Sequence, residues 1–96
     1  MPTWSTTESF EQDVKKLTPE EKAKFRSAVA AFVADIKSRR FRKGLRVKGV
    51  QGAEGIFEMT WAKNGRATFQ YGPEARPGEP HGIWRRCGTH LVFRKP

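Results

Sequence analysis

The stretch that decides the fold is residues 55–72, GIFEMTWAKNGRATFQYG. Apolar and polar residues alternate on both sides of its Lys-Asn-Gly tripeptide, residues 63–65. Strict alternation is typical of a half-buried β-strand, and Asn-Gly is a strong turn signal between two strands. The stretch therefore predicts a β-hairpin with one apolar and one polar face.

The register of this hairpin follows from the same pattern. A two-residue Asn-Gly turn would mix polar and apolar side chains on both faces of the hairpin. A three-residue loop over 63–65, with Gly65 in the left-handed conformation at a bulge, separates them, and we predict this loop. The facing residues would then be Trp61 and Ala67, Met59 and Phe69, Phe57 and Tyr71, Thr60 and Thr68, and Glu58 and Gln70.

Two helices are predicted before the hairpin. Phe10, Val14 and Leu17 share one helix face by their spacing, and Ser5 with Glu8 forms a candidate capping box for this first helix. The next helix follows almost without a loop, so the two form a helical hairpin or a bent pair.

The start of the second helix carries three signals. Thr18 is an N-cap, Pro19 suits the first helical position, and Glu21 completes a capping box. Gly44 is the latest position at which this helix ends. Its apolar stripe consists of Phe25, Val29, Phe32, Val33 and Ile36.

Shorter strands complete the predicted sheet. We expect an edge strand over residues 2–6, a third strand over 81–87 and a short terminal strand over 90–95. Residues 45–55 are rich in glycine and predict an irregular edge, whereas residues 73–80, PEARPGEP, predict a loop.

These elements predict one α+β domain over residues 1–96. The N-terminal strand and the two-helix hairpin pack on one face of a small, mostly antiparallel sheet. The other face of this sheet is polar, which makes it a platform for a ligand.

The charge of the chain is unevenly distributed. The net charge is +9, and residues 1–38 carry six acidic and six basic side chains, so the whole excess lies in residues 39–96. A basic half of a compact domain favours nucleic acid as a partner, because its cations can bind backbone phosphates. Solubility and an acidic protein partner are the alternative explanations.

The sequence also predicts where the protein works. One cysteine cannot form an internal disulfide, and no stretch reads as a signal peptide or a membrane span. We therefore expect a cytoplasmic protein without contact to a membrane.

The order of these segments resembles the RelE/ParE superfamily of bacterial toxin–antitoxin toxins. The resemblance runs over nearly the whole chain and rests on a pattern of segments. These are the opening strand with Trp4, the FEQDVKKL and FRSAVAAFV helices, LRVKG, the EMTW and GRATFQY strands, and CGTHLVF near the end.

This resemblance implies a RelE-like fold and an endoribonuclease that cuts mRNA, usually on the ribosome, across the polar face of the sheet. A cognate antitoxin protein would cover that face. The ParE branch shares the fold but poisons gyrase, so a non-catalytic toxin or an orphan binding module is the alternative.

The resemblance also implies site residues. It places catalytic roles on His90, Arg66, Glu58, Arg85 and Arg86. Strand alternation would direct Arg85 and Arg86 to opposite faces, so that at most one of them would face the RNA.

Four further residues are candidates for RNA contact. Lys48 and Arg46 are expected along the RNA backbone, with a solvated loop as the alternative. Tyr71 is a candidate for base stacking or a core residue, and His81 is a candidate for RNA contact or a backbone-bonded histidine.

The chemistry expected of such a site needs no cofactor. A base takes the proton of the 2′-hydroxyl, cations stabilise the charged phosphate, and an acid protonates the leaving oxygen. A metal site is not expected, because Cys87, His81 and His90 lack the paired spacing of zinc ligands. Cys87 instead suits a small buried position.

Overall fold

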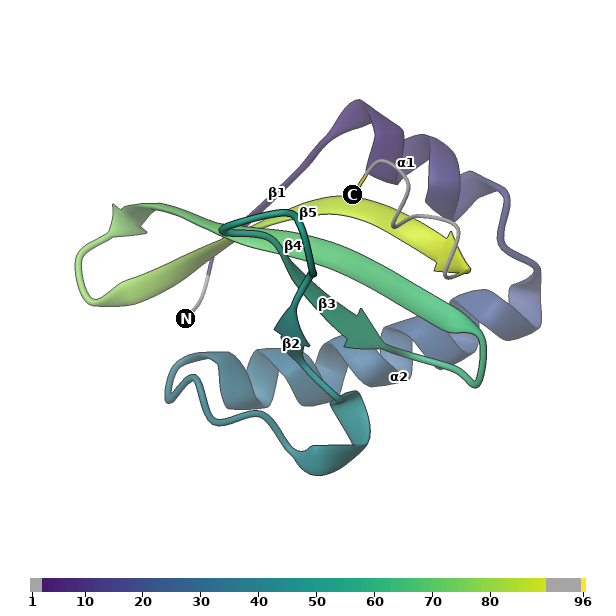
Figure 1. Cartoon of the computed structure of the whole chain (residues 1–96), viewed down its shortest axis with the longest axis horizontal. Helices are drawn as coiled ribbons and strands as arrows, with labels where there is room; N and C mark the ends of the chain where they lie inside the picture. The colour runs from purple at the N-terminus through teal and green to yellow at the C-terminus, as the bar shows by residue number, and fades with distance from the viewer. Residues whose placement is uncertain (1–2, 90–95) are drawn as a thin grey trace.

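The computed structural model describes residues 3–89 and 96 of the chain. Its elements are β1 (Thr3–Thr6), α1 (Glu8–Lys15), α2 (Pro19–Ile36), the short 3-10 helix η1 (Lys43–Leu45), β2 (Lys48–Gly49), β3 (Phe57–Thr60), β4 (Gly65–Arg76) and β5 (Glu79–Thr89) (Figure 1). The strand predicted over 90–95 lies outside the described residues, and His90 lies there with it.

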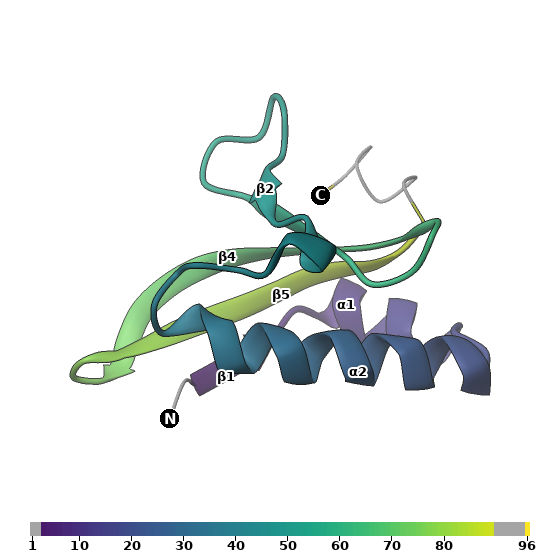
Figure 2. The ribbon, with the colours of Figure 1, turned by 90° about the horizontal axis from the view of Figure 1, so that it is seen from below.

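The strands form one five-stranded sheet in the order β1-β5-β4-β3-β2. β1 is parallel to β5, and the other pairs are antiparallel. Both helices cover one face of this sheet, while β2 and the loop that follows it rise from the other face (Figure 2). The predicted α+β architecture is therefore confirmed.

The core lies between the helices and the apolar face of the sheet. Phe32 and Ile36 of α2 are fully buried, as are Met59 of β3 and Phe69 of β4, and Trp84 of β5 is nearly so. The ring of Phe32 packs edge-on against Phe69, with 4.8 Å between the ring centroids. The helix stripe and the apolar strand face predicted from periodicity thus meet in one aromatic cluster.

The start of α2 agrees with its sequence signals. The Thr18 hydroxyl accepts a hydrogen bond from the Glu21 amide at 3.2 Å, and the Glu21 carboxylate accepts one from the Thr18 amide at 2.8 Å. The helix ends at Ile36, well before Gly44, and Arg39 then takes a left-handed conformation with a φ of 56°. No described helix is long and apolar enough to cross a membrane.

The capping box predicted for the first helix is wrong. Ser5 cannot cap α1 because it belongs to β1, where it pairs with Ile83. The N-cap is Thr7, whose hydroxyl accepts a hydrogen bond from the Phe10 amide at 3.1 Å. The strand therefore runs directly into the helix, with one residue between them.

The register predicted for the hairpin is also wrong, by two residues. Phe57 pairs with Phe69, Met59 pairs with Ala67, and the loop of three residues is 62–64 rather than 63–65. A shift of two residues keeps every side chain on its face, so the separation of polar and apolar faces alone could not fix the register.

The packing of a tryptophan explains this register. Gly65 has no positive φ and begins β4. A Cβ atom on Gly65 would lie 2.5 Å from Cε2 of Trp61, so the indole packs directly over the glycine backbone. Gly65 is required here for close approach rather than for a left-handed turn.

The loop predicted for the proline-rich stretch 73–80 is wrong. This stretch forms the tip of a long hairpin. β4 and β5 continue to Arg76 and Glu79, which pair across a turn at 77–78. Pro73 falls in a register irregularity between Gly72 and Arg76, at a point beyond the last β3–β4 pair. Its missing amide therefore costs no ladder hydrogen bond, which is why proline is tolerated here.

Candidate nucleic-acid interface

A row of polar residues crosses the sheet on the face away from the helices. Lys48 pairs with Glu58, Glu58 pairs with Thr68, and Thr68 pairs with Arg86. Directly opposed residues of neighbouring strands lie about 5 Å apart and project from the same face. We call Lys48, Glu58, Thr68, Arg86 and the adjacent Arg85 the polar row.

A β-bulge brings the two arginines of the row together. Trp84 and Cys87 are both buried in the core, although strict alternation would place them on opposite faces. The register shifts between Thr68 and Phe69, which inserts one extra residue into β5. The prediction that Arg85 and Arg86 point to opposite faces is therefore wrong, and both line one shallow cavity of about 400 Å³.

Arg85 is held by Gln70 and Pro96. Its Nη1 donates to Oε1 of Gln70 at 2.6 Å, and its Nε donates to the backbone oxygen of Pro96 at 3.0 Å. The same Pro96 oxygen accepts a hydrogen bond from the Thr68 hydroxyl at 3.1 Å. The Gln70 amide fixes the orientation of the guanidinium without neutralising its charge.

Arg86 is held by a carboxylate. Its Nε donates to Oδ2 of Asp13 in α1 at 2.6 Å, and its Nη2 donates to Oδ1 at 3.2 Å. Partial burial raises the pKa of the Asp13 carboxyl. The hydrogen bonds from Arg86 and from the Cys87 amide, together with the charges of Arg86 and Lys16, outweigh burial and leave this pKa below its ordinary value.

The topology of the sheet explains this ion pair. β1 ends at Thr6, so beyond Trp84 no described strand pairs with this side of β5. The N-cap and a side chain of α1 bind the backbone of β5 there: the Thr7 hydroxyl donates to the Arg85 carbonyl at 2.8 Å, and Oδ2 of Asp13 accepts from the Cys87 amide at 3.0 Å. Asp13 thus replaces a strand partner as well as pairing with Arg86.

Glu58 is the acidic member of the row. It is nearly buried, and its Oε1 lies 4.0 Å from Nζ of Lys48 on the short edge strand β2. Lys48 itself is largely exposed. The row therefore carries a shielded carboxylate between an exposed lysine on one side and two arginines on the other.

Arg66 lies opposite Thr60, two pairs along the hairpin from Glu58 and Thr68 and on the same face. Its Nη1 folds back onto the turn and donates to the carbonyl oxygens of Ala62, Lys63 and Gly65 at 2.9–3.3 Å. Its described contacts are therefore with the hairpin turn.

His81 and Tyr71 lie away from the row. Both ring nitrogens of His81 contact hydroxyls of β1: Nδ1 lies 2.6 Å from Oγ1 of Thr3, and Nε2 lies 3.1 Å from Oγ of Ser5. Tyr71 packs edge-on against Phe57 and Phe69 on the helix-covered face, beneath the guanidinium of Arg39. Burial raises the pKa of the Tyr71 hydroxyl, although the charge of Arg39 lowers it in part.

The basic connector between α2 and β2, residues 39–48, carries six lysines and arginines and no acidic residue. Arg42 makes a bidentate ion pair with Asp35 of α2, which lowers the pKa of that carboxyl to about 2. Arg46 is exposed in a left-handed conformation with a φ of 49°. The predicted backbone-binding residues Lys48 and Arg46 thus share one basic segment beside the polar row.

The structure gathers some predicted site residues and separates others. Lys48, Glu58, Arg85 and Arg86 lie in one row. Arg66 lies on the same face but is hydrogen-bonded to the hairpin turn, whereas His81 and Tyr71 lie elsewhere in structural contacts. Sequence reasoning missed Asp13, which fixes Arg86 across 73 positions of sequence. No local pattern marks this contact, because it depends on where β1 ends beside β5.

Two other kinds of site have no support in the described part of the chain. No group of three or more histidine, cysteine, aspartate or glutamate side chains there could hold a metal ion. Burial raises the pKa of the Cys87 thiol to about 12, with the charges of Asp13 and Glu21 adding to it. Cys87 is therefore a buried thiol rather than a nucleophile.

Comparisons with known proteins find matches to the fold among solved structures. No protein-family model matches the sequence, and no curated protein matches it either. Solved structures do match. A structure of the E. coli DinJ–YafQ toxin–antitoxin complex aligns over 95% of this chain and 94% of that chain, with a TM-score of 0.70 and 13% identity.

Two further structures agree. The RelB–RelE antitoxin–toxin complex from Methanococcus jannaschii aligns over 95% of this chain and 98% of that chain, with a TM-score of 0.62 and 13% identity. The YoeB/ParE toxin from Agrobacterium tumefaciens aligns over 92% and 98%, with a TM-score of 0.66 and 12% identity. The chain therefore has the fold of the RelE/ParE superfamily of toxins.

Proposed function

We propose that this chain is the toxin of a toxin–antitoxin pair and that it cleaves mRNA as a metal-independent endoribonuclease, in association with the ribosome. The observation that carries the proposal is the polar row, where a bulge places Arg85 and Arg86 side by side on the helix-free face of a toxin fold. The +9 charge and the basic connector support an RNA partner.

In the proposed reaction a base removes the proton of a 2′-hydroxyl, and the 2′-oxygen attacks the adjacent phosphorus. The bond to the 5′-oxygen breaks, that oxygen takes up a proton, and a 2′,3′-cyclic phosphate forms. Arg85 is our candidate for stabilising the phosphate oxygens, because no side-chain carboxylate among the described residues pairs with it. His90 and Glu58 are the candidates for proton transfer, and Arg66, Lys48 and Arg46 for contacts to the RNA backbone.

His81 and Tyr71 are not included in this proposed site. Their side chains contact β1 and the helix-covered face, respectively, so they have structural partners already. The proposed antitoxin would inhibit the chain by covering the polar row.

The test compares two arginine substitutions of equal charge. Arg85→Ala should lower the rate of mRNA cleavage on purified ribosomes by about 100-fold, a typical loss when one transition-state donor is removed. Arg76→Ala, at the exposed tip of the long hairpin, should leave the rate unchanged. The cut ends should carry a 2′,3′-cyclic phosphate, and RNA with a 2′-deoxy nucleotide at the cleavage position should stay intact.

One observation favours a second candidate, a non-catalytic toxin or binding module of the same fold. Among the described residues, Glu58 lies beside Lys48 and His81 lies between two hydroxyls, so neither is an unengaged base next to Arg85. Growth arrest with gyrase-dependent DNA damage and no RNA cleavage would favour this candidate and contradict the first. An inert chain that binds partners without arresting growth would favour an orphan module.

A further inference from the structure

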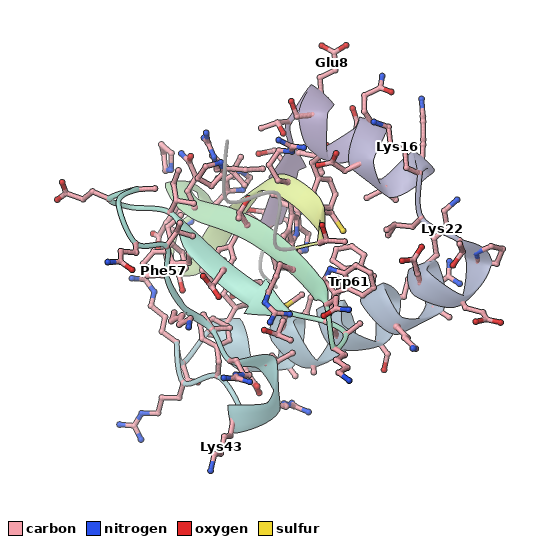
Figure 3. The ribbon with its side chains drawn as sticks, turned by 45° about the vertical axis from the view of Figure 1, so that its right-hand side comes forward. Glu8, Lys16, Lys22, Lys43, Phe57 and Trp61 are labelled. Carbon is pink, nitrogen blue, oxygen red and sulfur yellow. The ribbon has the colours of Figure 1, made fainter. Side chains whose placement is uncertain are left out.

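A second cavity lies beside Arg86, at one end of the polar row. It measures about 630 Å³ and opens between the α1–α2 turn, the β3–β4 turn and the end of β5. Its floor is formed by Leu17, Trp61 and Cys87, and Lys16, Lys24 and Lys63 lie around its rim. Figure 3 shows Trp61 between the end of the sheet and the helices, on the side of Lys16 and Lys22. We call it the turn pocket.

Trp61 gives the turn pocket an unused hydrogen-bond donor. The residue is only 8% exposed, and its indole Nε1 is buried without a hydrogen-bond partner. A buried donor without an acceptor costs free energy that a ligand acceptor can recover. The apolar floor and this single donor suit an apolar side chain carried beside a carbonyl or carboxylate group.

The charges around the turn pocket select an acidic occupant. Its two carboxylates are already engaged: Asp13 pairs with Arg86, and Glu21 caps the Thr18 amide. Lys16, Lys24 and Lys63 are exposed, and no ion pair is found for them within the described residues. The uncommitted charge at the rim is therefore positive.

A nucleobase fits this pocket poorly. RNA-binding proteins hold unpaired bases by stacking them on a free aromatic ring or guanidinium plane. The Trp61 ring has no such free face, since Gly65 lies against it and Phe25 packs on it with 5.8 Å between ring centroids. The Arg86 guanidinium is held in its pair with Asp13.

We propose that the turn pocket binds a segment of the cognate antitoxin in which an apolar side chain is flanked by acidic residues. The apolar side chain fills the space above Leu17 and Cys87, an acceptor of the segment takes the Trp61 N–H, and its carboxylates pair with Lys16, Lys24 and Lys63. This inference rests on the proposed toxin function and adds an attachment point next to the polar row that the antitoxin would cover.

The experiment uses the full chain and the purified product of the small reading frame beside its gene. Lys16→Glu, Lys24→Glu and Lys63→Glu together should weaken binding by about 30-fold, as expected for the loss of three exposed ion pairs. The matched control replaces Lys15, Lys22 and Arg26 by glutamate; these residues lie outside the turn pocket, and their replacement changes the net charge equally. This control should weaken binding by less than about threefold through long-range charge alone.

A second measurement follows the indole N–H group of Trp61 by NMR. The chain has three tryptophans, so its indole N–H groups give three separate NMR signals. The signal assigned to Trp61 through a Trp61→Phe variant should shift when the partner binds, and that of Trp4 should stay in place. Ala62→Tyr, at the wall of the pocket, should weaken binding while leaving the Trp4 signal of the free chain unchanged, which shows that the variant is folded.

The outcomes separate this inference from the proposed function. A complex that forms equally tightly with all variants and leaves the Trp61 signal in place would overturn the inference alone. Loss of RNA binding in the pocket variants, with partner binding intact, would also overturn it and assign the pocket to RNA. The absence of any complex with the unaltered chain would overturn the antitoxin partnership and the inference with it.

Discussion

At the scale of single residues, Gly65 shows how one position fixes a register. The alternation of apolar and polar residues in β3 and β4 is compatible with more than one pairing of these strands, because a shift of two residues keeps every side chain on its face. Only the close approach of the Trp61 indole, which leaves no space for a Cβ atom, selects the observed pairing.

This contact predicts the effect of adding one methyl group. Gly65→Ala should lower the free energy of unfolding by about 2 kcal/mol, since the new Cβ would press on a rigid, buried ring. Gly44→Ala is the matched control, because no atom lies within 4 Å of the position its Cβ would take and its φ is not positive. Urea unfolding measures both, and equal stabilities for the two variants would contradict the packing argument.

At the scale of elements, α1 completes the sheet where β1 stops. Asp13 and Thr7 satisfy backbone groups of β5 beyond the end of β1, and Asp13 also holds Arg86 of the polar row. The helix therefore positions part of the proposed RNA-binding face as well as covering the core.

Removing the Asp13 carboxylate should test this role. Asp13→Ala should destabilise the fold by about 2–3 kcal/mol at neutral pH, because the Cys87 amide and the Arg86 guanidinium both lose their acceptor. Glu11→Ala, an exposed substitution of the same charge on the same helix, should cost much less. Chemical unfolding with circular dichroism detection provides the comparison.

The pH dependence of this difference has a defined sign. The pKa of Asp13 is lower in the folded chain than its ordinary value, so its stabilisation is fully present above the unfolded pKa of about 3.9 and is lost as the pH falls through the folded pKa. The stability gap between the unaltered chain and Asp13→Ala should therefore narrow below about pH 4. A gap that stays constant down to pH 2 would show that the carboxylate charge contributes nothing.

At the scale of the whole molecule, the excess positive charge of residues 39–96 is partly exposed on the basic connector, beside the polar row. Arg40, Lys43 and Arg46 of the basic connector are exposed, and no ion pair holds them within the described residues. Arg42 and Asp35 tie this connector to α2 through a bidentate ion pair. The cations are thus presented on a fixed segment rather than on a free tail.

This arrangement predicts how RNA binding responds to salt. Replacing Arg40, Lys43 and Arg46 by glutamine should reduce the slope of log affinity against log salt by about 2, because each lost phosphate contact to a single strand contributes about 0.7. Replacing Lys15, Lys22 and Arg26 in the electrically balanced N-terminal part should change the slope little. Fluorescence anisotropy with a labelled single-stranded RNA measures both slopes, and equal reductions would refute a localised interface.

The sequence by itself determined the elements whose signals are local. The capping box of α2 and its apolar stripe follow from residues within one turn of each other, and the two faces of the hairpin follow from period-two alternation. These features arise from neighbouring backbone geometry, which the order of residues specifies directly. They were sufficient to predict the α+β architecture and the resemblance to the RelE/ParE toxins.

Only the tertiary structure decided which residues meet. The hairpin register depended on the packing of Trp61 over Gly65. A bulge in β5 placed Arg85 and Arg86 on the same face of the sheet. The Asp13–Arg86 ion pair joined residues 73 positions apart. Such contacts depend on where one element ends beside another. Strand alternation and local residue spacing do not predict these end points. The sequence therefore determined the composition of the polar face, whereas close packing and the point at which β1 ends beside β5 set its geometry.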